Sequence, residues 1–60
     1  MWIKTKGGYL LNTDNVEYII YNDGNTYASG LGLDHIIADY DCVDYIFDNL
    51  NRGVAVMEVR

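Results

Sequence analysis

The chain has 60 residues, half of them hydrophobic, with six Tyr and no Pro. Nine acidic residues against four basic ones give a net charge of -5, which excludes a general affinity for nucleic acid, because phosphate binding needs an excess of Lys and Arg. The apolar content excludes a disordered acidic tail. We therefore expect one small folded domain over residues 1–60.

The first third of the chain predicts a β-hairpin. Residues 2–6 alternate weakly between apolar and polar side chains, Lys6-Gly7-Gly8 is a turn signal, and residues 9–12 resume extended structure. The run Asn12-Thr13-Asp14-Asn15 then interrupts the strand pattern. Asn and Asp side chains bond to their own backbone and favour turns at such places.

The segment from Val16 to Tyr21 has the strongest strand pattern in the chain. Only Glu17 is clearly polar, so we expect a central strand that is covered on much of both faces. The dipeptide Asp23-Gly24 predicts a tight hairpin turn, since a type I′ turn needs positive φ at both central residues. Residues 26–29 would form the returning strand.

Glycine marks the next change of direction. Gly30 and Gly32 indicate a bend or a bulge. The segment from Leu33 to Ala38 alternates poorly, and the pattern fits either a strand or a short helical turn.

The segment from Asp41 to Asn51 is the one stretch with clear helical periodicity. The spacing of its apolar residues predicts a packed face of Val43, Ile46, Phe47 and Leu50, with Cys42 on the flank. Asp41 suits the N-cap and Gly53 suits the residue after the helix end. Val54 to Val59 then predicts a closing strand.

These elements predict an α+β fold: a mostly antiparallel sheet of four to five strands, with the helix of about 41–51 packed on one face and the strand of about 54–59 closing the sheet. One helix cannot cover a whole sheet, and the other face would carry Trp2 and several Tyr side chains. An exposed apolar face of this kind marks an interface. A 60-residue domain also buries only about 60% of its unfolded surface, so we expect a homo-oligomer.

Catalytic, cofactor and metal sites are not predicted. His35 and Cys42 are the only His and Cys, which excludes an intrachain disulfide and a Cys/His metal cage. We interpret Cys42 as a small core residue and His35 as a structural histidine. The acidic residues Asp39, Asp41 and Asp44 lack the glycine and terminal glutamate of a calcium loop. We expect a protein without catalytic activity.

The candidate partner-binding surface combines acidic and aromatic side chains. At about 100° per residue, Asp41, Asp44, Tyr45 and Asp48 fall on the helix face opposite the apolar residues, and Tyr40 precedes them. Carboxylates attract a basic partner, and Tyr rings add cation–π contacts with Arg. The alternative to partner binding is a solvent-exposed helix face whose Asp residues cap the helix.

The expected location is the cytoplasm, or the host cytoplasm if a phage encodes the protein. A single unpaired Cys suits a reducing compartment. Lys4 and Lys6 are not followed by the apolar region of a signal peptide, and no apolar run approaches the roughly 20 residues that a membrane span needs.

The opening of the chain resembles short bacterial and phage proteins of uncharacterised function. The residues that carry this resemblance are Met1-Trp2-Ile3-Lys4-Thr5, Gly8, Asn12-x-Asp14-Asn15-Val16 and Ile19. A similar opening occurs in small flagellar proteins of the FlbD type, which also run through a hairpin to a helix. The resemblance covers about 20 residues, and the chain departs from it through residues 30–38 and the strand after the helix. It implies a non-enzymatic accessory protein of a bacterium or phage.

The sequence therefore predicts a small binding module that regulates or inhibits a protein partner with a basic surface. An inhibitor of a host-defence protein belongs to this class. The alternative is a module that binds a small molecule or nucleotide at subunit junctions, for which Lys4, Lys6, Arg52 or Arg60 would have to converge on the phosphates.

Overall fold

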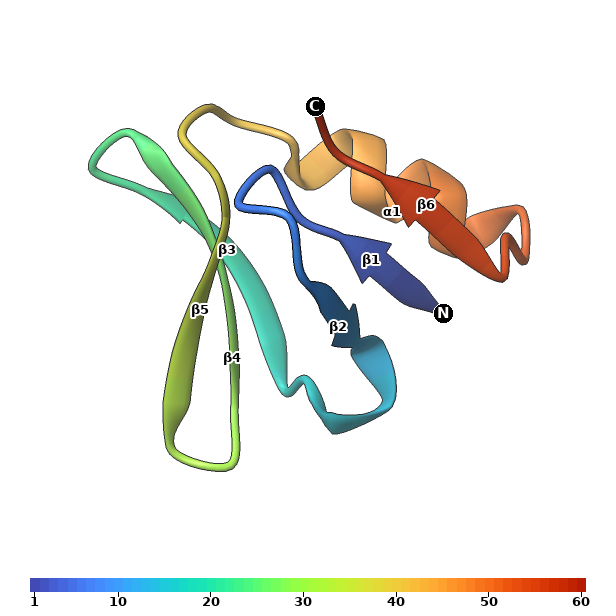
Figure 1. Cartoon of the computed structure of the whole chain (residues 1–60), viewed down its shortest axis with the longest axis horizontal. Helices are drawn as coiled ribbons and strands as arrows, with labels where there is room; N and C mark the ends of the chain where they lie inside the picture. The colour runs from blue at the N-terminus through green and yellow to red at the C-terminus, as the bar shows by residue number, and fades with distance from the viewer.

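The computed structural model describes all residues from Met1 to Arg60 and contains six strands, one α-helix and one 3-10 helix. In chain order these are β1 (Trp2–Lys4), β2 (Leu10–Asn12), η1 (Thr13–Asn15), β3 (Tyr18–Asn22), β4 (Asn25–Gly30), β5 (Leu33–Ala38), α1 (Val43–Asn51) and β6 (Val56–Glu58). Figure 1 shows β6 passing in front of α1, and the long β3–β4–β5 meander standing beside the shorter strands.

The strands form two three-stranded sheets, with the orders β2-β1-β6 and β3-β4-β5. The α+β class is confirmed, whereas a single sheet of four to five strands is not what forms. Three of the four strand pairings are antiparallel, and β6 pairs with β1 in parallel, with Met57 opposite Ile3. The division falls at η1, where the Asn12 side chain accepts a hydrogen bond from the Asp14 N–H (3.0 Å) and turns the chain away from the first sheet.

The prediction that the Val16–Tyr21 segment is a central strand is wrong. Its strand, β3, lies at the edge of the second sheet, and β4 is central. Tyr18 and Ile20 are 54% and 46% exposed. The central position goes to a strand of smaller residues because Thr26 and Ala28 of β4 allow close packing on the core side, where both are fully buried.

Two tight turns connect the strands of the second sheet. Asp23 and Gly24 have φ values of 51° and 86°, which confirms the predicted hairpin turn. Leu31 and Gly32 repeat this geometry between β4 and β5, with φ values of 53° and 76°. The segment from Leu33 to Ala38 is a strand and not a helical turn.

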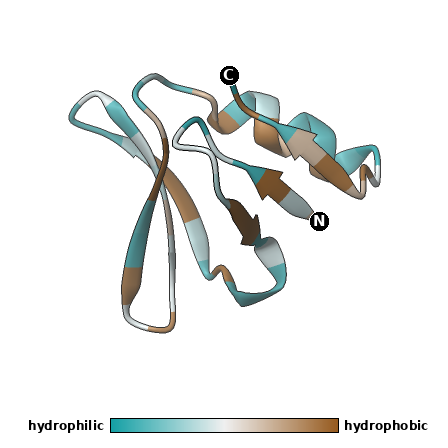
Figure 2. Ribbon diagram, viewed as in Figure 1, coloured by the Kyte–Doolittle hydropathy of each residue, from teal (hydrophilic) through white to brown (hydrophobic).

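The core lies where the two sheets and the helix meet. It comprises Ile3, Ala28, Ile37, Ala38, Cys42, Ile46, Met57 and Val59. Figure 2 shows hydrophobic stretches on β1, β2 and the crossing region of β3 and β5, whereas the β3–β4 turn is hydrophilic. Only 12 of the 60 residues are buried, so the apolar core is small for the number of apolar residues present.

The helix is shorter than predicted and uses fewer of its apolar residues. It begins at Val43, and its buried residues are Ile46 and Asn49. Phe47, expected on the packed face, is 66% exposed. The closing strand likewise shortens to three residues, Val56–Glu58. The helix contacts the core over one narrow line because the sheets are only three strands wide.

Buried polar contacts fix the start of the helix. The Thr26 hydroxyl donates to the Tyr40 carbonyl oxygen (2.7 Å) and accepts from the Cys42 N–H (3.1 Å). Thr26 is fully buried in β4, so these bonds attach the N-terminal end of α1 to the central strand of the second sheet. The helix is far too short to cross a membrane.

Candidate protein-binding surfaces

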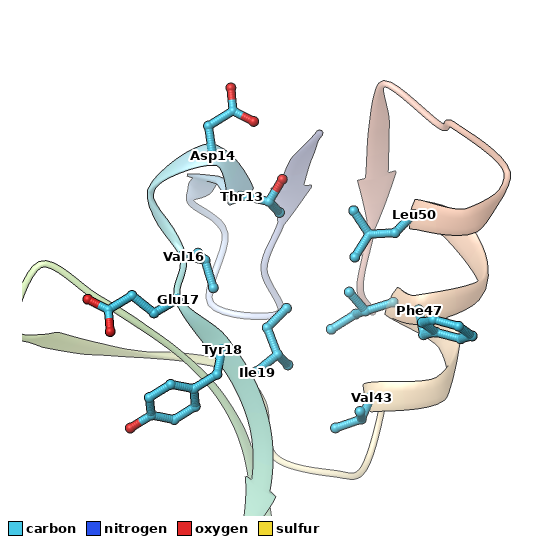
Figure 3. A pocket seen from close by; sticks show the side chains of 10 residues that line it. Thr13, Asp14, Val16, Glu17, Tyr18, Ile19, Val43, Phe47 and Leu50 are labelled. Atoms are coloured by element: carbon cyan, nitrogen blue, oxygen red, sulfur yellow. The ribbon is translucent and has the colours of Figure 1, made fainter.

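An apolar groove separates β3 from α1. Its lining residues are Thr13, Asp14, Val16, Glu17, Tyr18, Ile19, Val43, Ile46, Phe47 and Leu50. Figure 3 shows Val16 and Ile19 on one wall, with Val43 and Leu50 facing them from the helix. The Phe47 ring points away from β3, and the carboxylates of Asp14 and Glu17 point outward from the β3 side. The groove therefore has apolar walls, and the carboxylates of its two acidic lining residues point away from the opening.

The backbone of β3 is unpaired on the side that faces the groove. Its only neighbouring strand is β4, and no further hydrogen bond uses a backbone group of residues 18–22. In an antiparallel pair, alternate residues direct their N–H and C=O groups away from the partner. Counting from the pair Asn22 and Asn25 that closes the two-residue turn, these outward residues are Ile19 and Tyr21.

Two other sheet edges are covered. At the edge of β5, the Ile37 carbonyl oxygen accepts from the Lys6 N–H (2.9 Å), and the Ile36 carbonyl oxygen accepts from the Tyr9 hydroxyl (3.0 Å). Near β6, tyrosine hydroxyl groups donate to the carbonyl oxygens of Glu58 and Arg60. Edge strands are usually protected by such contacts, by charges or by proline, and β3 has none of these.

The tyrosines of the predicted partner-binding surface have structural hydrogen bonds. Tyr40 donates its hydroxyl to the Arg60 carbonyl oxygen (2.5 Å), and Tyr45 donates to the Glu58 carbonyl oxygen (3.4 Å). Both rings line one shallow hollow with Glu58 and Arg60. The structure thus brings Tyr40 and Tyr45 together beside the C-terminal strand, and both side chains stay exposed.

The three Asp residues of that surface have different environments. Asp41 accepts a hydrogen bond from the Val43 N–H (3.2 Å) and so caps the helix from one residue before the N-cap position, which Cys42 occupies. Asp48 pairs with Arg52 at 3.1 Å. Asp44 is exposed and has no hydrogen bond or ion pair from its side chain. Asp44 is therefore the most available carboxylate of the three.

Each basic side chain of the chain already has an acidic partner. Lys6 pairs with Asp39 at 2.6 Å, and its ammonium group lies 5.5 Å from the centre of the Tyr40 ring. The hydrogen bond from Lys6 lowers the pKa of Asp39 and raises that of Lys6. Lys4 and Arg60 both contact Glu58, and the hydrogen bond from Arg60 lowers the pKa of the Glu58 carboxyl.

Cys42 is a core residue, as predicted, whereas the structural role of His35 stays a prediction. Cys42 is only 3% exposed, and burial raises the pKa of its thiol, which opposes a nucleophilic thiolate. His35 is half-buried, with its ring 6.2 Å from that of Tyr9. No three His, Cys, Asp or Glu side chains are arranged to hold a metal ion.

Comparisons with protein-family models, curated proteins and solved structures gave no match. The resemblance of the opening to FlbD-type proteins stays a prediction.

Sequence reasoning missed the groove and the open edge. Val16 and Ile19 belong to a segment that was expected to be covered on both faces, and the helix residues opposite them were expected to pack on the sheet. The polar turn of residues 12–15 is the sequence feature that could have indicated the open edge. It separates the two sheets and leaves β3 without a second neighbouring strand.

Proposed function

We propose that the protein is a non-enzymatic binding module that regulates or inhibits a protein partner with a basic surface. The observation that carries the proposal is the outer face of α1, where Asp44 is exposed and unpaired beside Tyr45. Asp41 and Asp48 extend the acidic surface, and Tyr40 adjoins it through the hollow shared with Tyr45. An incoming Arg would find both a carboxylate and an aromatic ring.

The charge distribution favours a protein partner over a nucleotide. Phosphate recognition needs free cationic groups that converge, but Lys4, Lys6, Arg52 and Arg60 are each within 4.0 Å of a carboxylate. The alternative of a small-molecule or nucleotide sponge would be supported by a ligand mass that co-purifies with the protein in native mass spectrometry.

Self-association is part of the proposal. Large apolar side chains remain exposed on β3, on β5 and around the hairpin tip, among them Ile20, Ile36, Leu31 and Leu33. Association with a second subunit would remove this apolar surface from water, which is favourable. We propose a homo-oligomeric accessory protein of a bacterium or phage, located in the host cytoplasm, with inhibition of a host-defence protein as one version of this role.

The test uses a partner protein that is isolated from the host by its binding to this chain and is then purified. Its affinity should fall when salt rises from about 50 to 500 mM, because exposed charges are screened. Asp44→Asn should weaken binding several-fold. Asp23→Asn is the matched control, since it removes the same charge from the β3–β4 turn. Affinity that is indifferent to both salt and Asp44→Asn would refute the role of the acidic surface.

A further inference from the structure

We propose that the groove between β3 and α1 binds an extended, cationic segment of another protein, which adds to β3 as a fourth strand. This site lies on the opposite side of α1 from the acidic-aromatic surface, so the inference does not depend on that surface. The proposed occupant is defined by three properties: an extended backbone, apolar side chains on one face and Lys or Arg on the other.

The unpaired edge of β3 specifies the extended backbone. Ile19 and Tyr21 present N–H and C=O groups that no other part of the chain bonds. Strand addition satisfies such groups with main-chain hydrogen bonds, while alternate side chains of the added strand give specificity. A bound helix has no free backbone groups along its length to offer, so it would leave this edge unsatisfied.

The walls of the groove specify the apolar face. Val16 and Ile19 face Val43 and Leu50 across the opening. Ile46 of α1 also lines the groove. Ile19 is only half-buried and Leu50 is exposed, so added apolar side chains would remove more of this surface from water. An added strand places every second side chain on the same face, which matches a single apolar groove.

The acidic residues beside the groove and the net charge of the chain specify the charge of the occupant. Asp14 and Glu17 are its charged lining residues, and neither carboxylate has an ion pair. No Lys or Arg lines the groove. The chain as a whole has a charge of -5. A cationic segment would therefore be attracted to the groove, and an acidic one would be repelled.

A second copy of the chain fits this position less well. Pairing β3 with β3 of another copy would place the β4 and β5 strands of that copy beyond the added strand, on the side where α1 stands (Figures 1 and 3). A single segment without further strands avoids this obstruction.

The test uses a capped seven-residue peptide that alternates Lys and Val, and the full-length protein. Calorimetry should show saturable binding, and NMR should show shifts at the Ile19 and Tyr21 amides and the Ile46 methyl groups. A peptide that alternates Glu and Val should bind at least tenfold more weakly. Absence of saturable binding by the Lys peptide, or equal binding by the two, would overturn the proposal.

N-methylated peptides test the added strand itself. One isomer carries methyl groups on the Val amides and the other on the Lys amides, so each blocks one edge of the peptide backbone. We expect one isomer to lose at least tenfold in affinity while the other retains binding, because only one edge faces β3. Equal effects of the two isomers would overturn the proposal.

Matched variants of the helix test the place of binding. Leu50→Lys puts a positive charge on the groove wall and should lower the affinity for the Lys peptide about tenfold. Asn51→Lys adds the same charge at the neighbouring exposed position outside the groove and should change affinity less than twofold. Sedimentation of the free protein tests the competing occupant: a dimer that Leu50→Lys dissociates would show that a second copy fills the groove and would overturn the proposal.

Discussion

At the scale of single residues, Leu31 adopts a backbone conformation that its side chain disfavours. It has a φ of 53° at the tip of the β4–β5 hairpin and is 79% exposed. The left-handed conformation costs a residue with a Cβ roughly 1–2 kcal/mol, and Asn tolerates it best among such residues. Asp23 occupies the equivalent position of the β3–β4 turn, where its short polar side chain suits the geometry.

We predict that Leu31→Asn stabilises the protein by about 1 kcal/mol, because the substitution relieves this strain and removes an exposed apolar side chain. Urea unfolding followed by circular dichroism would measure the change in the free energy of unfolding. Leu33→Asn is a control in the adjoining strand, where no left-handed conformation is required, and should not stabilise. A lower unfolding midpoint for Leu31→Asn would contradict the strain argument.

Gly30 is constrained by lack of space for a side chain and not by its backbone conformation. A Cβ at this position would lie 2.0 Å from the carbonyl oxygen of Asn15, so the end of β4 and the end of η1 approach each other directly. We predict that Gly30→Ala destabilises the fold by about 1–3 kcal/mol or more, as overpacking does when backbone must move. In Gly7→Ala the added Cβ would meet only ordinary contacts at 3.7 Å or beyond. Similar unfolding midpoints for the two variants would refute this close packing.

At the scale of elements, the residue that caps the start of α1 with its side chain is Asp41, which precedes the N-cap residue Cys42. Cys42 has no side-chain hydrogen bond to the helix, and Asp41 supplies one to the Val43 N–H instead. We predict that Asp41→Ala costs about 1 kcal/mol, the usual value for loss of a cap. Asp41→Asn retains an acceptor oxygen and should cost less. Chemical unfolding of the two variants decides this, and equal losses would mean that charge, and not the hydrogen bond, is what matters.

The strands show why the open edge arises. β3 carries no charge, no proline and no bulge along its pairing with β4, whereas the pairing of β4 with β5 is irregular between Thr26 and Tyr27. Bulges and charges discourage further pairing, and their absence leaves a strand that can accept another one. The edge and the apolar groove beside it therefore form one continuous surface.

At the scale of the whole molecule, the two sheets are joined by few contacts at the surface. One is the Lys6–Asp39 ion pair, which connects the turn after β1 to the segment between β5 and α1. The pKa of Asp39 is lowered in the folded chain by the hydrogen bond from Lys6. The pair therefore stabilises above the ordinary Asp pKa of 3.8, and its contribution is lost as pH falls through the lowered value of the folded state.

We predict that Asp39→Asn lowers the thermal midpoint slightly at pH 7, and that the difference from the parent protein disappears as pH falls through the lowered pKa of Asp39 in the folded chain. The effect should be small because both side chains are exposed and screened by salt. Asp23→Asn, which removes an acid without an ion pair, provides the comparison. A difference that stays unchanged throughout an acid titration would show that Asp39 acts through something other than this pair.

The sequence by itself determined the features that depend on neighbouring residues. The first hairpin, the Asp23-Gly24 turn, the single helix and the buried state of Cys42 follow from turn chemistry, helical spacing and side-chain size. The α+β class followed from the order of these elements.

Tertiary structure decided which strands lie next to each other and which apolar surface stays open. The pattern of Val16 to Tyr21 indicates hydrophobicity on both faces, but it does not tell a central strand from an edge strand beside a groove. Phe47 has the helical spacing of a core residue and remains exposed because the narrow sheets leave it nothing to pack on. These outcomes depend on contacts between distant segments, such as Gly30 against Asn15 and Thr26 against Cys42, which local sequence patterns do not encode.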